Sequence, residues 1–164
     1  MDASFISDET LDQLPTPSQV GQSRVGGIDM NKPRMRAVLN AALSLACSPD
    51  GFTVGKLAET VRSRLGATDS RYDARRAAYD IRKLRGKDLI HKIPDSRRYT
   101  IPPQAIRTIA ALVILREKVL RPILAGLGKP KLGRKPNNWS TLDQHYELIR
   151  QDMFTLMHDL RIAA

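Results

Sequence analysis

The residues best suited to recognise a partner lie between positions 71 and 98. A helix expected over residues 70–85 has one side, at about 100° per residue, that carries long polar side chains: Tyr72, Arg75, Arg76, Tyr79 and Lys83. Its other side carries small or aliphatic residues at three/four spacing: Ala74, Ala77, Ala78, Ile81 and Leu84. Such a helix packs closely on a core and presents cations and phenols outward. That surface suits a DNA major groove, where Arg and Lys bind guanine edges.

A basic hairpin is expected directly after this helix. Leu89, Ile90 and Ile93 predict a half-buried strand, and residues 99–101 predict a short return strand. Residues 94–96, Pro-Asp-Ser, have turn chemistry, since Pro sets one backbone dihedral and Asp or Ser can bond back to the main chain. Arg97 and Arg98 follow the turn, where they can bind phosphate or enter a narrow minor groove. A solubilising charge at a hairpin tip is the alternative.

The order helix, strand, basic turn and strand resembles the winged helix-turn-helix family. The run LRGKDLIHKI…RRYTI is similar to the helix-to-wing junction of bacterial regulators of the multiple-antibiotic-resistance and arsenical-repressor type, over roughly residues 33–125. The resemblance implies that helix 70–85 enters the major groove and wing 94–98 touches backbone or minor groove. It implies double-stranded DNA as partner and transcriptional control as role. The alternatives are a DNA-targeting adaptor subunit of a larger nucleoprotein assembly, such as a mobile-element or replication complex, and a winged helix that binds structured RNA. The expected DNA-binding residues are Arg71, Tyr72, Arg75, Arg76, Tyr79, Lys83, Arg97 and Arg98, with packing at the helix start as an equal alternative for Tyr72.

Charge divides the 164 residues into segments. Residues 1–31 hold one basic and five acidic groups and predict a flexible acidic tail, with a short helical turn near residues 8–14 as an option. Residues 32–103 hold sixteen basic and seven acidic groups, and residues 104–136 hold eight and one. The basic excess, within a net charge of +10, therefore belongs to the expected DNA-binding domain and the segment after it.

Earlier elements must position the basic helix. Pro33 suits the first turn of a helix over residues 33–46, and residues 52–53 predict a short strand. Thr53 predicts the cap of a second helix, which Gly66 ends. Residues 67–70 are then the turn of a helix-turn-helix, with Ser70 or Asp69 as cap. Asp73 favours the start of the basic helix, and Asp80 is expected to pair with Arg76 or Lys83.

The C-terminal third predicts assembly. A helix over residues 104–124 is apolar on more than one face, with a kink or end at Pro122, and residues 126–139 form a basic Gly/Pro-rich linker. Residues 140–164 hold a final amphipathic helix, from about 142 to 162, with a heptad-like seam. A homodimer is expected, with a fold-back of the last helix as its rival and a protein partner for the terminal helices as a further option. The expected dimer residues are Ile109, Val113, Leu120, Tyr146, Ile149, Met153, Leu156 and Leu160.

Other classes of protein are not favoured. His91, His145 and His158 lack metal-ligand spacing, and no phosphate loop, nucleophile elbow or paired carboxylates occur, so no catalytic residue, metal or cofactor is expected. The single Cys47 is expected in the core. No apolar run is long enough to span a bilayer, which predicts a cytoplasmic, nucleoid-associated protein. The expected fold is mainly α with a small β-hairpin: a winged helix, a long helix and a C-terminal pairing helix.

Overall fold

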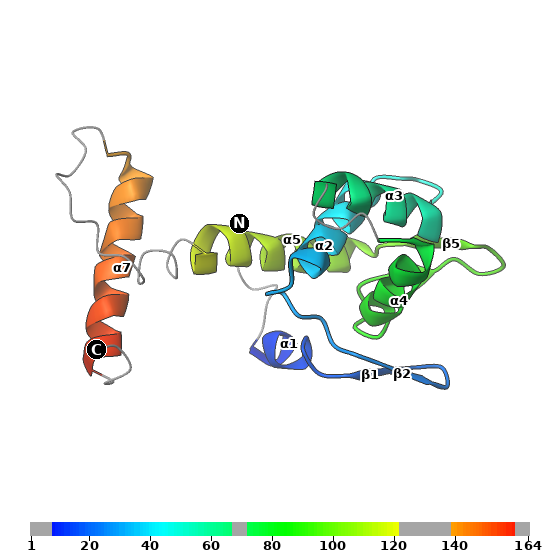
Figure 1. Ribbon diagram of the computed structural model, residues 1–164, viewed down its shortest axis with the longest axis horizontal. Helices are drawn as coiled ribbons and strands as arrows, with labels where there is room; N and C mark the ends of the chain where they lie inside the picture. The colour runs from blue at the N-terminus through cyan, green and yellow to red at the C-terminus, as the bar shows by residue number, and fades with distance from the viewer. Residues whose placement is uncertain (1–7, 67–71, 122–138, 160–164) are drawn as a thin grey trace. The chain divides into compact units, whose positions relative to one another are not determined.

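The computed structural model describes residues 8–66, 72–121 and 139–159 (Figure 1). The chain divides into unit 1, Met1–Val113, and unit 2, Ile114–Ala164. It is mainly helical with small antiparallel sheets, so the coarse fold class expected from the sequence is confirmed. The unit boundary falls inside the segment predicted as one long helix, and the turn 67–70 and the residues from Pro122 to 138 lie outside the described residues.

Three helices form the centre of unit 1: α2 (Pro33–Leu45), α3 (Val54–Leu65) and α4 (Ala74–Arg85). Pro33 opens α2, and Thr53 caps α3 by accepting the backbone N–H of Lys56 at 3.2 Å, both as predicted. The carboxylate of Asp73 caps α4 by accepting the N–H of Arg76 at 2.8 Å. The basic helix therefore begins at residue 74, and the prediction of a cap at residue 69 or 70 is wrong.

A three-stranded antiparallel sheet borders these helices, in the order β3-β5-β4. Its strands are β3 (Phe52–Thr53), β4 (His91–Lys92) and β5 (Arg98–Thr100), with Tyr99 opposite both Phe52 and Lys92. The turn before β5 contains Asp95 at a φ of 52°. The Ser96 hydroxyl closes this turn because it donates to the Ile93 carbonyl at 3.0 Å and accepts the Arg98 N–H at 3.1 Å. The predicted basic hairpin is thus present.

The core of unit 1 joins α2, α3 and α4 to α5 (Pro103–Ile114). Leu39, Leu57 and Leu84 are completely buried, and Ile109 of α5 is also 0% exposed. The expectation that Ile109 lies in a dimer interface is therefore wrong, because its side chain is used inside the unit. The apolar stripe predicted for α4 is correct for Ala77, Ile81 and Leu84, whereas Ala74 is exposed and Ala78 half-buried.

Residues 8–31 are folded onto this core, which corrects the expectation of a tail. They form α1 (Asp8–Gln13) and an antiparallel hairpin of β1 (Ser18–Val20) and β2 (Ser23–Val25). Leu14, Val25 and Ile28 are buried, and the Ile28 N–H donates to the Leu14 carbonyl at 2.7 Å. The helical turn considered near residue 8 is present.

Unit 2 contains a π-helical segment, η3 (Leu115–Leu120), and the helix α7 (Thr141–Asp159). Ser140 and Asp143 form a reciprocal cap at the start of α7: the Asp143 N–H donates to the Ser140 hydroxyl oxygen at 3.2 Å, and the Ser140 N–H donates to the Asp143 carboxylate at 3.1 Å. The Tyr146 hydroxyl donates to the Lys118 carbonyl, so α7 is bonded to η3 within this unit.

Candidate nucleic-acid interface

The outer surface of α4 carries charge of one sign. The helix contains one acidic residue, Asp80, which is 0% exposed. All other ionisable groups of the helix apart from the Tyr79 phenol are cations: Arg75, Arg76, Arg82, Lys83 and Arg85. Arg75 and Arg82 are exposed, while the other three are half-buried. A helix whose only carboxylate is turned inward carries charge of one sign wherever it is exposed, which suits a polyanion.

A buried polar cluster fixes the start of α4. The Tyr72 hydroxyl donates to Oδ2 of Asp80 at 3.0 Å, and Nη2 of Arg34 on α2 lies 3.2 Å from Oδ1 of the same carboxylate. Nη1 of Arg62 on α3 donates to the Tyr72 carbonyl at 3.4 Å. Tyr72 is 1% exposed, so the alternative that it packs at the helix start is confirmed and its place on the DNA-facing side is wrong. Asp80 pairs with Arg34 in place of the expected Arg76 or Lys83. The cluster ties α4 to both preceding helices.

Burial changes the acidity of this cluster. Removal of water around the Asp80 carboxyl raises its pKa above the ordinary value of 3.8. The guanidinium of Arg34 and the hydroxyl of Tyr72 act in the opposite direction, as do the more distant charges of Lys83 and Arg76. Desolvation is the largest effect, so the neutral acid is favoured in the folded protein more than in the unfolded chain.

The β4–β5 hairpin holds its two arginines differently. Arg97 is exposed beside the turn. Arg98 lies on β5, where Nη1 donates to the Gly51 carbonyl at 3.3 Å. Gly51 has a φ of 69°, and a Cβ there would lie 2.4 Å from the Tyr99 carbonyl oxygen, so the chain needs glycine at this close approach. Arg98 is exposed as well, so both arginines are open to an outside partner, and Arg98 also supports the loop before β3.

The β1–β2 hairpin lies against α4, an arrangement that the sequence reasoning missed. The Gly26 N–H donates to the Tyr79 hydroxyl oxygen at 3.3 Å, and the Lys83 ammonium lies 5.2 Å from the centre of the Tyr79 ring. A Cβ on Gly86 would lie 2.6 Å from the Ser18 Cβ. Tyr79 and Lys83, expected to contact DNA, thus form part of the contact with this hairpin, although Tyr79 remains 41% exposed.

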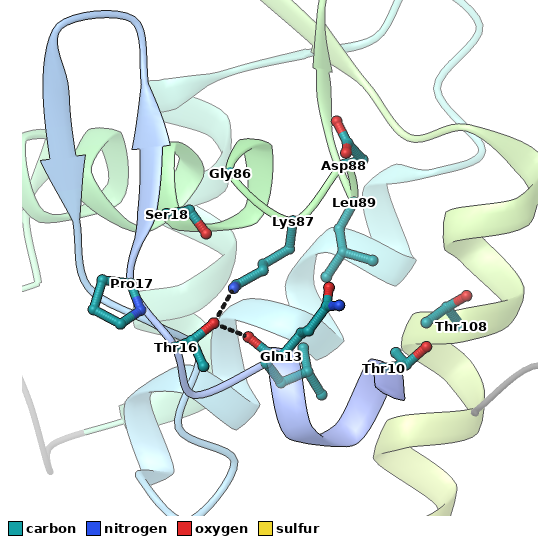
Figure 2. A pocket seen from close by; sticks show the side chains of 11 residues that line it. Thr10, Gln13, Thr16, Pro17, Ser18, Gly86, Lys87, Asp88, Leu89 and Thr108 are labelled. Carbon is teal, nitrogen blue, oxygen red and sulfur yellow. Dashed lines mark hydrogen bonds between the residues drawn. The ribbon is translucent and has the colours of Figure 1, made fainter. Parts of the chain in front are cut away.

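A polar pocket of about 410 Å³ lies at the base of the β1–β2 hairpin (Figure 2). The Lys87 ammonium donates to the Thr16 hydroxyl oxygen at 3.0 Å, and that hydroxyl donates to the Gln13 carbonyl at 2.7 Å. Thr10 and Thr108 line the pocket from α1 and α5. The chain of bonds from Lys87 to Gln13 attaches the N-terminal segment to the end of α4.

The remaining expected site residues are distributed over unit 2 and the unit boundary. Val113 packs partly against the core of unit 1. Within unit 2, Leu120, Ile149 and Leu156 are 43%, 40% and 50% exposed, Met153 is half-buried and Tyr146 is bonded to Lys118. Arg71 and Leu160 lie outside the described residues.

Within the described residues, no group of three or more His, Cys, Asp or Glu side chains is arranged to hold a metal ion. Cys47 is exposed, which corrects its expected place in the core. Of the helices described, none has the length and apolarity needed to cross a membrane. In comparisons with protein-family models, curated proteins and solved structures, nothing matches this chain.

Proposed function

We propose that this protein binds double-stranded DNA, with α4 in the major groove and the β4–β5 hairpin on the backbone or minor groove. The observation that carries the proposal is the charge of α4, whose single carboxylate is buried while Arg75 and Arg82 are exposed and three further cations are half-buried. A solvated helix face normally mixes both signs of charge, since neighbouring opposite charges stabilise an isolated helix. A one-signed helix at the surface is the electrostatic footprint expected for DNA.

The order of elements supports the same proposal. The succession α2, β3, α3, α4, β4 and β5, with the strands in the order β3-β5-β4, resembles a winged helix-turn-helix. In that arrangement α4 is the recognition helix and β4–β5 is the wing. Arg75 and Arg76 lie in the first turn of α4, the part of a recognition helix that contacts base edges. Arg97 extends the cationic surface to the hairpin.

The role proposed is transcriptional regulation by a homodimer, without a catalytic step. Apolar side chains at least 38% exposed are concentrated in unit 2: Ile114, Val119, Leu120, Leu142, Leu148, Ile149, Phe154 and Leu156. A two-fold dimer through this unit would set two recognition helices about 34 Å apart and would select a palindromic site. The same apolar surface favours a second candidate, an adaptor subunit of a larger nucleoprotein assembly that binds another protein there.

Selection of bound duplexes from a random pool tests the proposal directly. We expect an enriched motif, and an affinity that falls steeply as salt rises, because each neutralised phosphate releases counterions. A palindromic motif supports the dimeric regulator, and a single asymmetric motif supports the adaptor. Absence of duplex binding, or preferential competition by structured RNA at equal concentration, overturns the proposal.

A further inference from the structure

The β1–β2 hairpin carries an inference that rests on the proposed function. We infer that this hairpin is a second DNA-contacting arm, which lies along α4 and meets the same duplex. The residues proposed to contact DNA are Gln19 and Arg24 on the outer face of the hairpin and Gln22 at its tip. The major groove of a DNA duplex admits a two-stranded β-ribbon as well as a helix, so the shape of the hairpin is compatible with DNA contact.

The position of the hairpin on α4 is the first argument. At about 100° per residue, Tyr79 and Gly86 fall on the side of α4 opposite the buried Ala77 and Leu84. Both contact the hairpin or its continuation, through Gly26 and Ser18. The hairpin therefore lies over the solvent side of the C-terminal half of α4 and leaves the first turn, with Arg75, open. A DNA duplex that binds Arg75 on this side of α4 would therefore also contact the hairpin.

The outer face of the hairpin is the second argument. Side chains alternate along a strand, and Val25 is buried while Gln19 and Arg24 are exposed. Gln19 and Arg24 are cross-strand partners, so they lie side by side on the face turned away from α4. Glutamine pairs with adenine edges, and arginine with guanine edges or phosphate. The exposed tip adds Gln22.

Charge decides between an arm that helps DNA binding and a cover that blocks it. A segment that shields a cationic helix from DNA would bind the helix more tightly if it carried carboxylates, which could pair with the cations as the DNA phosphates do. Residues 15–28 contain one arginine and no acidic residue. The acidic groups of residues 8–31 flank the hairpin, in α1 and at Asp29, and are not part of it. The hairpin thus adds to the positive surface.

The arm is also rigidly held, which lowers the entropy cost of ordering it on DNA. The turn Val20–Ser23 has two central residues, and Gly21 adopts the φ of 59° that such a tight turn requires. At the base, Ile28 is bonded to Leu14, and Lys87 to Thr16. These contacts hold the backbone of the hairpin in place before DNA arrives.

The test compares the full chain with a Gln19→Ala/Arg24→Ala double variant, on the selected duplex and on a random duplex. Both side chains are exposed, and the hydrogen bond that Gln19 Nε2 donates to the Gly21 carbonyl at 3.0 Å is exposed too, so the thermal stability of the variant should lie close to that of the parent. We expect a loss of roughly tenfold in affinity for the selected duplex. If Arg24 contacts phosphate, its loss in the variant also lowers the salt slope by about one. If it contacts a base, the slope is unchanged and the variant selects a less specific sequence.

Matched measurements separate the possible failures. Arg121→Ala removes one exposed arginine from unit 2 and should bind DNA like the parent. In a hydroxyl-radical footprint, Gln22→Ala should abolish protection of a stretch of DNA backbone. That stretch should lie next to the one whose protection Arg75→Ala abolishes. Equal affinity of the double variant and the parent, or higher affinity of the variant, overturns the inference while leaving the proposed function intact. Absence of duplex binding by the parent is the failure of the proposed function itself.

Discussion

The Tyr72 hydroxyl and the Asp80 carboxylate, eight residues apart, are joined by a 3.0 Å hydrogen bond inside the protein. Tyr72 precedes α4 and Asp80 lies in its middle, so the bond sets the angle at which the chain enters the helix. Arg34 of α2 donates a hydrogen bond to the other oxygen of the same carboxylate. A carboxylate is buried only where hydrogen-bond partners replace water. The burial of Asp80 therefore shows that specific polar contacts hold the orientation of α4.

The first prediction concerns Asp80 and pH. Because the folded protein holds the Asp80 proton more tightly than the unfolded chain, the free energy of unfolding falls as pH rises from about 3.8 through the raised pKa. Asp80→Asn removes this titration. The stability of the parent relative to Asp80→Asn should therefore decrease from acidic to neutral pH, as measured by urea denaturation at several pH values. A relative stability that increases with pH would mean that Arg34 lowers the pKa more than burial raises it.

The second prediction concerns the first turn of α4. Arg75→Ala and Arg76→Ala should each cost about 1–3 kcal/mol on the selected duplex and relax the sequence preference at one position, if each makes a bidentate base contact. Fluorescence anisotropy on the selected and on a random duplex measures both effects. Equal losses on the two duplexes identify a phosphate contact, and no loss excludes the residue from the interface. Arg121→Ala, whose exposed ion pair with Glu117 is worth little, is the matched control.

The third prediction separates the two arginines of the β4–β5 hairpin. Arg97→Ala should weaken binding to all duplexes, lower the salt slope by about one and leave the melting temperature unchanged. Arg98→Ala should also lower the free energy of unfolding by about 1 kcal/mol, because the Gly51 carbonyl loses its hydrogen bond. Salt titrations and thermal melts of the two single variants distinguish these effects. A DNA affinity insensitive to salt contradicts the electrostatic part of the proposal.

The fourth prediction concerns the base of the β1–β2 hairpin. A Cβ on Gly27 would lie 2.0 Å from the carbonyl oxygen of Pro15, and backbone atoms cannot move away cheaply. Gly27→Ala should therefore lower the free energy of unfolding by about 1–3 kcal/mol. The matched control is Gly55→Ala in α3, where the nearest described atom to a new Cβ, apart from the adjoining residues and the backbone of the helix itself, is the Thr53 hydroxyl oxygen at 3.9 Å. That variant should be up to about 1 kcal/mol more stable than the parent, since alanine favours the helix.

The fifth prediction concerns unit 2. Ile149→Glu with Met153→Glu should dissociate the proposed dimer, because charges would replace apolar contacts on the seam of α7. Light scattering should show a monomer, and affinity for a palindromic site should fall more than affinity for a random duplex. The parent chain provides the reference: a monomeric parent at micromolar concentration contradicts the dimer and favours the adaptor.

Local signals in the sequence were sufficient for much of unit 1. The proline at α2, the threonine cap of α3, the glycine that ends it and the turn before β5 all act within a few residues, so each can be recognised from its neighbours. The β1–β2 hairpin could not be recognised in this way, since three-residue strands with one polar face give no extended periodic pattern. Its stability comes from distant contacts such as that of Gly26 with Tyr79.

One signal for the polar cluster was nevertheless present in the sequence. Asp80 lies three residues after Ala77 and four before Leu84, which places it within the apolar stripe of α4 and not beside it. A carboxylate at such a position predicts a buried partner. The identity of that partner could not be read from local spacing, because Arg34 is 46 residues away.

The π-helical segment Leu115–Leu120 has a consequence for the apolar run that contains it. A π turn closes its hydrogen bonds at i→i+5, so it holds more residues than an α turn and changes the direction in which later side chains point. Before it, Ile109 and Leu112 enter the core of unit 1; within it, Val119 and Leu120 are exposed. A hydrophobic pattern that is interrupted only by Arg116, Glu117 and Lys118 can thereby serve two purposes, and the phase of the helix decides which residue serves which. Deleting one residue between positions 115 and 118 would reset that phase without removing any apolar side chain that either surface uses.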